Sequence, residues 1–438
     1  MSTESAPAPV TDPIVTAAAA ATAPIVFSDS ISSIDFVDPI SSIDFVDPVS
    51  FEHGVPHAAY AKLRAEDPVS WHAASYPSPS EPGYWLLTRH ADVQKALVDS
   101  SGFSSWLGTT SMLNEPVERL DISRLLLINM DPPGHTRYRR LISRSFSSRV
   151  IDRLEPEVRR LCKNVLDAVV PRGECDFVSD IASPLPMRVI FALLGVPEED
   201  WQSLVGMSDS MIDHAGTDAA FAGALSMYAY SDQLASRRRE QPGDDVVSQL
   251  LTAEVNGDKL TQAEFNAFFL LLVVAGNETT RNLISGGMLA LMQNPEQNDK
   301  LRREPRLWAS AVEEMLRYVS PVVQFRRTAA RDLEFGGKTL RAGDRVILAH
   351  ASANRDERVF ADPDRFDIAR SPNPHVAFGV GAHLCLGAAL ARLEARCMFE
   401  ELFARITDLE LTGPVTRLRS NFLNGLKTMP VRFRALTA

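Results

Sequence analysis

The stretch from Phe378 to Gly387 reads FGVGAHLCLG, and a helical pattern follows it over residues 386–405. Three glycines surround Cys385 within this stretch. Glycine permits tight backbone turns and lets the chain approach a flat ligand closely. A thiol at the start of a helix lies at the positive end of the helix dipole, which favours the thiolate. The stretch therefore predicts that Cys385 is either a nucleophile or a metal ligand.

Cys385 is open to other interpretations. A zinc site needs about four ligands at matching spacing, and only His375, His383 and Cys397 lie nearby. A cysteine protease needs a paired histidine and an orienting Asn or Asp, for which no local signature exists. A lone cysteine is otherwise a small buried hydrophobe, but the glycine framing argues against this for Cys385. We predict that buried role for the other three cysteines, Cys162, Cys175 and Cys397.

The composition excludes several classes of protein. Of the 438 residues, 45% are hydrophobic and 23% charged, which is typical of a soluble globular protein. The net charge of −11 leaves no protein-wide basic footprint for nucleic acid. No apolar run approaches the ~20 residues of a membrane span, and the first basic residue is Lys62, so a signal peptide is not supported. We expect a cytoplasmic protein with no membrane anchor and no nucleic-acid partner.

The chain divides into a leader and a globular body. Residues 1–48 are predicted to be a disordered leader, rich in Ala, Pro, Ser and Thr at its start. The nonamer ISSIDFVDP occurs at 31–39 and again at 40–48. Two nonamers are too short for a repeat fold, so replication slippage is the simpler explanation, although the second copy is the better candidate to pack. The body is predicted to be one catalytic domain over residues 49–438.

Helical spacing dominates residues 90–331, with good examples at 151–170 and 262–292. Short strand-like segments surround the Gly336-Gly337 turn, and nothing resembles regular alternation of strands and helices. The sequence therefore predicts a mainly α protein with small β-sheets, of the α+β class.

The pattern F-G-x-G-x-H-x-C-x-G resembles the haem-thiolate loop of cytochromes P-450. This resemblance implies a cytochrome P-450 fold with a single large haem-binding domain that holds haem b. It makes Cys385 the axial ligand of the iron, whose thiolate pushes electron density onto the metal. The further loop positions that the resemblance assigns to the cofactor site are Phe378, Gly379, His383 and Gly387.

A second motif lies inside the long apolar helix, where residues 275–280 read AGNETT. It resembles the oxygen-binding groove of the family, in which Ala275 and Gly276 leave room for O2 at a helix-propensity cost of about 1 kcal/mol for the glycine. The resemblance makes Glu278 and Thr279 the catalytic residues, which deliver protons. The alternatives are a threonine that bonds back to a preceding carbonyl and a carboxylate that is paired or solvated.

A third motif, Glu314-Met-Leu-Arg317, places an acid and a base on one helix face. This pattern is weak by itself, because charged helices often carry it. The resemblance implies that Arg365, in Asp364-Arg365-Phe366, joins the pair in a buried network that supports the thiolate loop.

A fourth motif, MDPPGHTRYR at residues 130–139, resembles the family's segment at the haem propionates. Buried propionates need cationic or hydrogen-bonding partners. His135 and Arg139 share one helix face, and the resemblance adds Arg327 and His383 to the set. Singly, each arginine could instead be a solubilising surface residue.

The resemblance implies a monooxygenase that uses O2, two electrons and two protons to convert R–H into R–OH and water. The scattered cysteines cannot build an iron–sulfur cluster, so the electron donor is predicted to be a separate ferredoxin with its reductase. The basic segment 137–160 would steer an acidic ferredoxin, or it is a solvated helix face. Its candidate contacts are Arg140, Arg144, Arg149 and Arg153.

The segments predicted to line the substrate cavity are mostly apolar, which favours a hydrophobic substrate with few polar anchors. The sequences at 275–281 and 420–427 resemble a bacterial subgroup that includes linalool, sterol and methyl-branched lipid hydroxylases. We therefore expect oxidation of a terminal methyl on an isoprenoid-like chain. A peroxide-driven peroxygenase and a non-catalytic haem sensor or electron carrier are the alternatives. The Glu278–Thr279 pair argues against the first, and the apolar substrate segments argue against the second.

Overall fold

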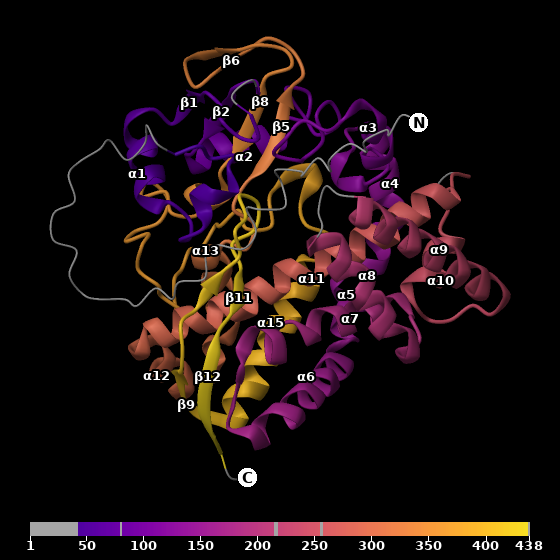
Figure 1. Ribbon diagram of the computed structural model, residues 1–438, viewed down its shortest axis with the longest axis vertical. Helices are drawn as coiled ribbons and strands as arrows, with labels where there is room; N and C mark the ends of the chain where they lie inside the picture. Colours follow the sequence, from indigo (N-terminus) through magenta and orange to yellow (C-terminus); the bar gives the residue numbers. More distant parts are fainter. Residues whose placement is uncertain (1–42, 79–80, 214–217, 255–256, 437–438) are drawn as a thin grey trace, which may run out of the picture. The chain divides into compact units, whose positions relative to one another are not determined.

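The computed structural model describes residues 43–78, 81–213, 218–254 and 257–436, and helices carry most of this part of the chain (Figure 1). The α-helices are α1 (His57–Glu66), α2 (His90–Val98), α3 (Val117–Ser123), α4 (Gly134–Ile142), α5 (Ser148–Asp152), α6 (Glu155–Val169), α7 (Pro184–Leu194), α8 (Trp201–Asp213), α9 (Asp218–Glu240), α10 (Val246–Thr252), α11 (Gln262–Gln293), α12 (Pro295–Arg303), α13 (Trp308–Val319), α14 (His350–Ala353) and α15 (Ala388–Arg405). The predicted mainly α fold with small sheets is confirmed.

The strands are short and form small sheets. They are β1 (Val69–His72), β2 (Tyr84–Leu87), β3 (Phe103–Ser104), β4 (Glu174–Asp176), β5 (Phe325–Ala329), β6 (Leu333–Phe335), β7 (Lys338–Leu340), β8 (Arg345–Leu348), β9 (Ile406–Leu411), β10 (Thr416–Arg417), β11 (Leu426–Thr428) and β12 (Pro430–Ala435). The largest sheet has the order β1-β2-β8-β5-β3, in which only β2 and β8 run parallel. A second sheet has the order β4-β12-β9, and β6-β7 and β10-β11 are two-stranded.

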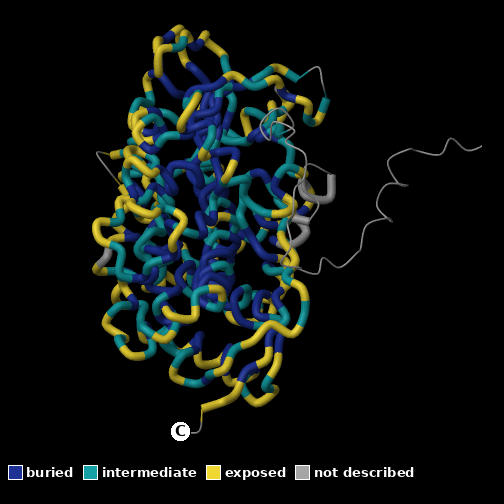
Figure 2. The backbone as a smooth tube through the Cα atoms, turned by 90° about the vertical axis from the view of Figure 1, so that its left-hand side faces the viewer, coloured by how far each residue is buried: buried dark blue, intermediate teal, exposed yellow. Residues whose placement is uncertain are grey.

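Helix α11 is the central element of the described part of the chain. A capping box starts it, in which the Thr261 side chain accepts from the backbone of Glu264 and the Glu264 side chain accepts from the backbone of Thr261. Its apolar residues extend around the whole helix, because α7, α9, α13 and α15 pack against it. The buried segments of Figure 2 lie along the middle of the molecule in agreement with this packing. The Ala275–Thr279 motif is therefore held at the centre of the protein.

The packed body starts earlier than predicted. Residues 43–48 are described, and Phe45 and Val46 are fully buried. The Asp44 carboxylate accepts from the Tyr84 hydroxyl at 2.9 Å, and the Gln324 side chain donates to the Phe45 carbonyl at 2.6 Å. The boundary at residue 48 is therefore wrong, because the second nonamer supplies apolar residues that the core takes up. The first nonamer and the rest of the predicted leader lie outside the described residues.

No helix in the described ranges combines the length and the apolar character that crossing a bilayer requires.

Candidate active site

The loop before α15 turns sharply at two glycines. Gly379 has φ +67° and Gly381 has φ +74°, a left-handed conformation that side chains rarely adopt. A Cβ on Gly381 would also lie 3.1 Å from the carbonyl oxygen of Leu97. The backbone N–H of Cys385 donates to the Phe378 carbonyl at 2.9 Å, which closes the loop. The glycine spacing read from the sequence therefore has a direct backbone cause.

Cys385 differs from the other three cysteines. It is exposed, whereas the others are buried as predicted. Protein atoms nevertheless surround its thiol closely, and burial raises the pKa of Cys385 above its usual value. The backbone N–H of Gly387 and the charge of Arg139 lower that pKa without cancelling the effect. The loop alone therefore does not favour the thiolate, and a metal cation at the sulfur would supply the missing stabilisation.

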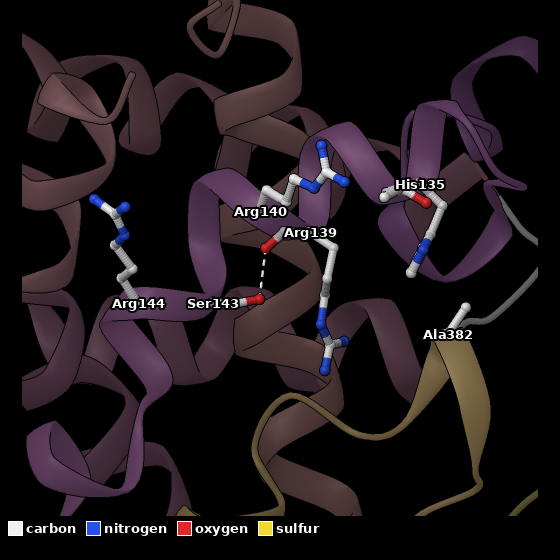
Figure 3. Close-up of a pocket in the computed structure, with 7 residues that line it drawn as sticks. His135, Arg139, Arg140, Ser143, Arg144 and Ala382 are labelled. Carbon is white, nitrogen blue, oxygen red and sulfur yellow. Dashed lines mark hydrogen bonds between the residues drawn. The ribbon is translucent and has the colours of Figure 1, made fainter. Parts of the chain in front are cut away.

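A cationic cluster lies beside the loop, consisting of His135, Arg139, Arg327 and His383. The rings of His135 and His383 have centroids 4.2 Å apart. The Arg139 guanidinium donates to the Leu384 carbonyl at 2.6 Å. Figure 3 shows His135 and Arg139 extending from α4 toward the loop segment that carries Ala382. The structure therefore brings the four predicted propionate partners together.

The charges of the cluster are only partly balanced, because Asp131 is the carboxylate that acts on Arg327 and His135 without forming an ion pair with either among the described residues. Within the described ranges, no carboxylate lies at ion-pair distance from Arg139 or Arg327, although Arg327 is only 4% exposed. Burial lowers the pKa of Arg327 to about 10, that of His135 to about 4 and that of His383 to about 3. At pH 7 the two histidines are therefore neutral donors and the two arginines carry the charge. The buried Nε2 of His135 has no hydrogen-bond partner. These features fit a doubly anionic ligand such as the two haem propionates.

The residues of the α11 motif lie in two different environments. The Thr279 hydroxyl donates to the Ala275 carbonyl at 2.9 Å, which is the back-bonded state named as an alternative. Ala275 is exposed in the middle of this buried helix and Thr279 is partly so, whereas Glu278 is buried and ion-paired with Arg281. Adjacent helical residues thus face different surroundings, as their spacing requires.

Gly276 lies where α7 packs against α11. A Cβ at this position would lie 2.7 Å from Cδ1 of Ile190 in α7. The missing side chain therefore makes room for α7 to pack against α11, and the role of Gly276 beside O2 stays a prediction.

The Glu314–Arg317 pair is fully buried, and its contacts correct one prediction. Arg317 donates to both Glu314 oxygens at 2.8 Å. The second arginine on Glu314 is Arg370, whose Nε lies 3.1 Å from Oε2. Arg365 contributes only its backbone carbonyl to Arg317, at 3.2 Å, because its side chain is exposed while the next residue, Phe366, points into the core. The predicted role of the Arg365 side chain is therefore wrong.

A second set of contacts, centred on Glu313, supports the Cys385 loop and was not predicted from the sequence. Glu313 accepts from Arg392 at 2.6 Å and lies 3.1 Å from His375. Burial alone would raise the pKa of Glu313, but these hydrogen bonds bring it down to about 2. Arg392 also lies 4.5 Å above the Phe378 ring. The partners are 62 and 79 residues from Glu313 along the chain, so no local pattern indicates them.

The basic segment divides into two sets of arginines. Arg137 pairs with Asp258 and Glu264, and Arg160 pairs with Glu157 and Glu198. The other set is exposed and, among the residues that the structure describes, forms no ion pair; it consists of Arg140, Arg144, Arg149 and Arg153. In Figure 3 the Arg140 side chain extends away from that of Arg139. Of this second set, Arg140 and Arg144 line the same pocket as His135 and Arg139, so the exposed basic surface borders the cationic cluster (Figure 3).

Two apolar segments, residues 322–325 and 421–426, meet in space and are candidates to line a substrate cavity. Val322 forms an isolated β-bridge with Leu423, and the N–H of Val323 donates to the Phe422 carbonyl at 2.8 Å. The Phe325 and Phe422 rings are in edge contact, with centroids 5.3 Å apart. These contacts form an apolar wall from two parts of the chain that are distant in sequence.

Comparison with known proteins gives a consistent result. A family profile described as Cytochrome P-450 matches residues 226–407. The steroid C26-monooxygenase of Mycolicibacterium smegmatis is 39% identical over 392 residues, covering 86% of this chain and 91% of that protein. The methyl-branched lipid omega-hydroxylase of Mycobacterium tuberculosis is 40% identical over 395 residues, covering 87% and 92%.

The solved structures agree. A cytochrome P-450 of Mycobacterium marinum in complex with pseudoionone has a TM-score of 0.82 and 37% identity, and the match covers 92% of this chain and all of that one. Members of this family hold a haem through a cysteine thiolate and need O2 and a redox partner. The chain belongs to the cytochrome P-450 family and is a bacterial-type P-450 monooxygenase.

Proposed function

We propose that the enzyme hydroxylates an apolar, isoprenoid-like substrate at a terminal methyl, with haem b as cofactor and electrons from a separate ferredoxin in the cytoplasm. The cationic cluster next to Cys385 is the observation that supports this cofactor site. Within the cluster the buried His135 Nε2 has no hydrogen-bond partner, and Cys385 is an exposed residue. Cys385 would bind the iron, and Arg139 and Arg327 would neutralise the propionates. When bound, the haem supplies the activation of O2 and the oxidation of the C–H bond.

Thr279 and Glu278 are the groups proposed to move protons. The Thr279 hydroxyl proton now points to the Ala275 carbonyl, and rotation about χ1 would redirect it without breaking the helix. The Glu278 carboxylate is buried and ion-paired with Arg281, so its position beside the motif is fixed. We assign the hydroxyl to orienting the proton in the site and the carboxylate to its supply.

The unpaired arginines support the proposal that a ferredoxin is the electron donor. Ferredoxins that serve such enzymes would need an acidic surface to match Arg140, Arg144 and Arg149. Among the described residues these side chains form no ion pair, whereas Arg137 and Arg160 each pair with a carboxylate. An exposed, uncompensated basic surface beside the cofactor site is the arrangement that electrostatic steering requires.

The substrate class rests on the apolar wall and on the relatives. The wall offers aromatic and branched side chains without a charged anchor, which suits a hydrocarbon chain. The named relatives act on a steroid at C26 and on the omega position of a methyl-branched lipid, and the solved relative binds pseudoionone. From the two enzyme names we infer a terminal position on a branched hydrocarbon chain for this enzyme.

The test is a reaction with isotopically labelled O2. Pseudoionone, a cholesterol-type sterol and a methyl-branched fatty acid are each incubated with the haem-loaded enzyme, a ferredoxin, its reductase and NADPH. We expect a spin-state change on substrate binding and one labelled oxygen in a terminal alcohol. Equal product from hydrogen peroxide without the electron donor would indicate the peroxygenase instead. Neither spectral change nor product with any substrate of the panel would contradict the proposal.

A further inference from the structure

Arg326 and Arg327 are neighbours in β5, and the alternation of a strand sends their side chains to opposite faces of the sheet. Arg327 belongs to the cationic cluster described above. On the other face Arg326 lies near Arg345 of β8, because Arg326 pairs with Ile347 and Thr328 pairs with Arg345 across the ladder. Arg326 and Arg345 are only 3% and 2% exposed. Two buried guanidinium groups therefore lie side by side on the face away from the cofactor site.

Arg326 binds the backbone of one loop, residues 108–114. It donates to the Leu113 carbonyl at 2.9 Å, to Oδ1 of Asn114 at 2.9 Å and to the Ser111 carbonyl at 3.5 Å. Burial and the neighbouring arginine lower its pKa to about 10, so it remains protonated at pH 7. A charged group held in this way loses several bonds at once if the loop moves.

Arg345 holds the same loop from the next strand. It donates to the Met112 carbonyl at 3.4 Å and to the Pro82 carbonyl, and it lies 3.8 Å from the Glu81 carboxylate. Arg326 thus makes most of the contacts to the loop, whereas Arg345 adds the Met112 carbonyl and ties it to residues 81–82. Lysine could not reproduce the planar fork of either guanidinium group.

The loop is shaped to allow this approach. A Cβ on Gly108 would lie 2.3 Å from Nη2 of Arg326 and 2.5 Å from the Thr328 hydroxyl. The next residue, Thr109, has φ +57°, an uncommon conformation for a β-branched residue. A strained residue beside an obligatory glycine persists only where the surroundings determine the conformation.

The clamped segment reaches the proposed substrate wall. The Met112 side chain is 5% exposed and packs in the same apolar cluster as Val323, with Phe422 packed against that cluster. A shift of the loop would therefore move Met112 relative to the wall that Val323 and Phe422 help to form.

We propose that Arg326 and Arg345 are positioning residues that clamp loop 108–114 onto the sheet and thereby set the position at which the substrate is oxidised, without touching the substrate. The selectivity part of this inference rests on the proposed function. The loop-holding part does not, and the two are measured separately.

The experiment compares Arg326→Lys, Arg345→Lys and Gly108→Ala with the haem-loaded wild type. Gly108→Ala disturbs the same contact from the loop side while both arginines stay in place. Arg341→Lys is the matched control, because Arg341 is exposed, lies just before β8 and pairs with Asp332. Amide hydrogen exchange of residues 106–116 measures the loop, and the ratio of terminal to internal alcohols from pseudoionone measures selectivity.

We expect at least about tenfold faster exchange in residues 108–114 for the three variants, with exchange in β5 unchanged, because one or two charge-assisted bonds are lost. The product ratio should change severalfold, while the haem content and the reduced CO spectrum remain those of the wild type. Unchanged exchange in all three variants would overturn the clamp. Faster exchange with an unchanged product ratio would overturn its role in selectivity. If the wild type oxidises no substrate of the panel, the proposed function fails while the exchange result still decides the clamp.

Discussion

Arg317 and Arg327 are two equally inaccessible arginines that the protein uses in opposite ways. Arg317 is completely buried and binds both oxygens of Glu314 at 2.8 Å, as well as the Asn354 and Pro363 carbonyls. Arg327 is 4% exposed, and the hydrogen bond that the structure shows for its side chain goes to the adjacent Arg326 carbonyl at 2.8 Å. The first arginine completes a network inside the chain, whereas the second has no ion-pair partner among the described residues and is balanced only at a distance by Asp131. The comparison teaches that incomplete satisfaction of a buried charge marks a binding site, and complete satisfaction marks a support.

The largest effect is expected where a completed network is broken. Glu314→Gln leaves Arg317 and Arg370 buried without their carboxylate, which should cost about 3–5 kcal/mol of the free energy of unfolding. Urea unfolding of the haem-loaded protein measures it. Glu334→Gln, at an exposed position of β6, is the control. A loss below about 1 kcal/mol, which is typical of surface ion pairs, would contradict the supporting role.

Substitution of Arg327 should have the opposite effect on the stability of the haem-free protein. Arg327→Leu should weaken haem binding by about 1.5–3 kcal/mol, because one charge-assisted partner of a propionate is lost. The haem-free protein should unfold at the same or a higher urea concentration, since an unpaired buried cation is removed. Haem titration and urea unfolding of the haem-free protein measure the two quantities. A haem-free variant destabilised as strongly as Glu314→Gln would show that Arg327 is a support as well.

The two α11 residues should also respond differently, because Thr279 bonds back to the Ala275 carbonyl whereas Glu278 is ion-paired with Arg281. Thr279→Ala should still consume O2 and reducing equivalents, but release hydrogen peroxide, with product per electron pair falling about tenfold. Glu278→Gln should instead slow turnover and raise the solvent deuterium isotope effect. Thr252→Ala is the matched control, because the Thr252 hydroxyl bonds back to the Ser248 carbonyl at 3.0 Å far from the motif. Tight coupling in Thr279→Ala would contradict the assignment.

The smallest effect is expected at the surface. Arg144→Gln and Arg149→Gln should each slow reduction by an acidic ferredoxin a few-fold at low salt, and the difference should vanish near 1 M salt, where the Debye length is ~3 Å. Arg160→Gln is the control, because Arg160 is paired with Glu157 and Glu198. A reduction rate that does not depend on salt would rule out steering by these arginines.

Local patterns were sufficient for much of the fold and of the site. The glycines around Cys385 and the capping residues of α11 act within a few residues, so their spacing carries the structural information. The second nonamer is the copy expected to pack, and its Phe45 and Val46 are buried, although the predicted leader extends to residue 48.

Contacts between distant segments could not be predicted in the same way. Arg365 and Arg370 both lie in one irregular stretch, and only the backbone path decides which guanidinium turns back to Glu314. The closeness of Ile190 to Gly276 depends on how α7 crosses α11. The sequence therefore indicated which residues matter more reliably than what each of them touches.

The cationic cluster and Cys385 together form the proposed haem-thiolate site. The most direct test is the spectrum of the reduced, CO-bound protein after Cys385→His, beside Cys397→Ser, which changes a buried cysteine twelve residues further along the chain. We predict that Cys397→Ser keeps the thiolate-type Soret band and that Cys385→His loses it while haem remains bound through the arginines. A thiolate-type band that persists in Cys385→His would contradict the account.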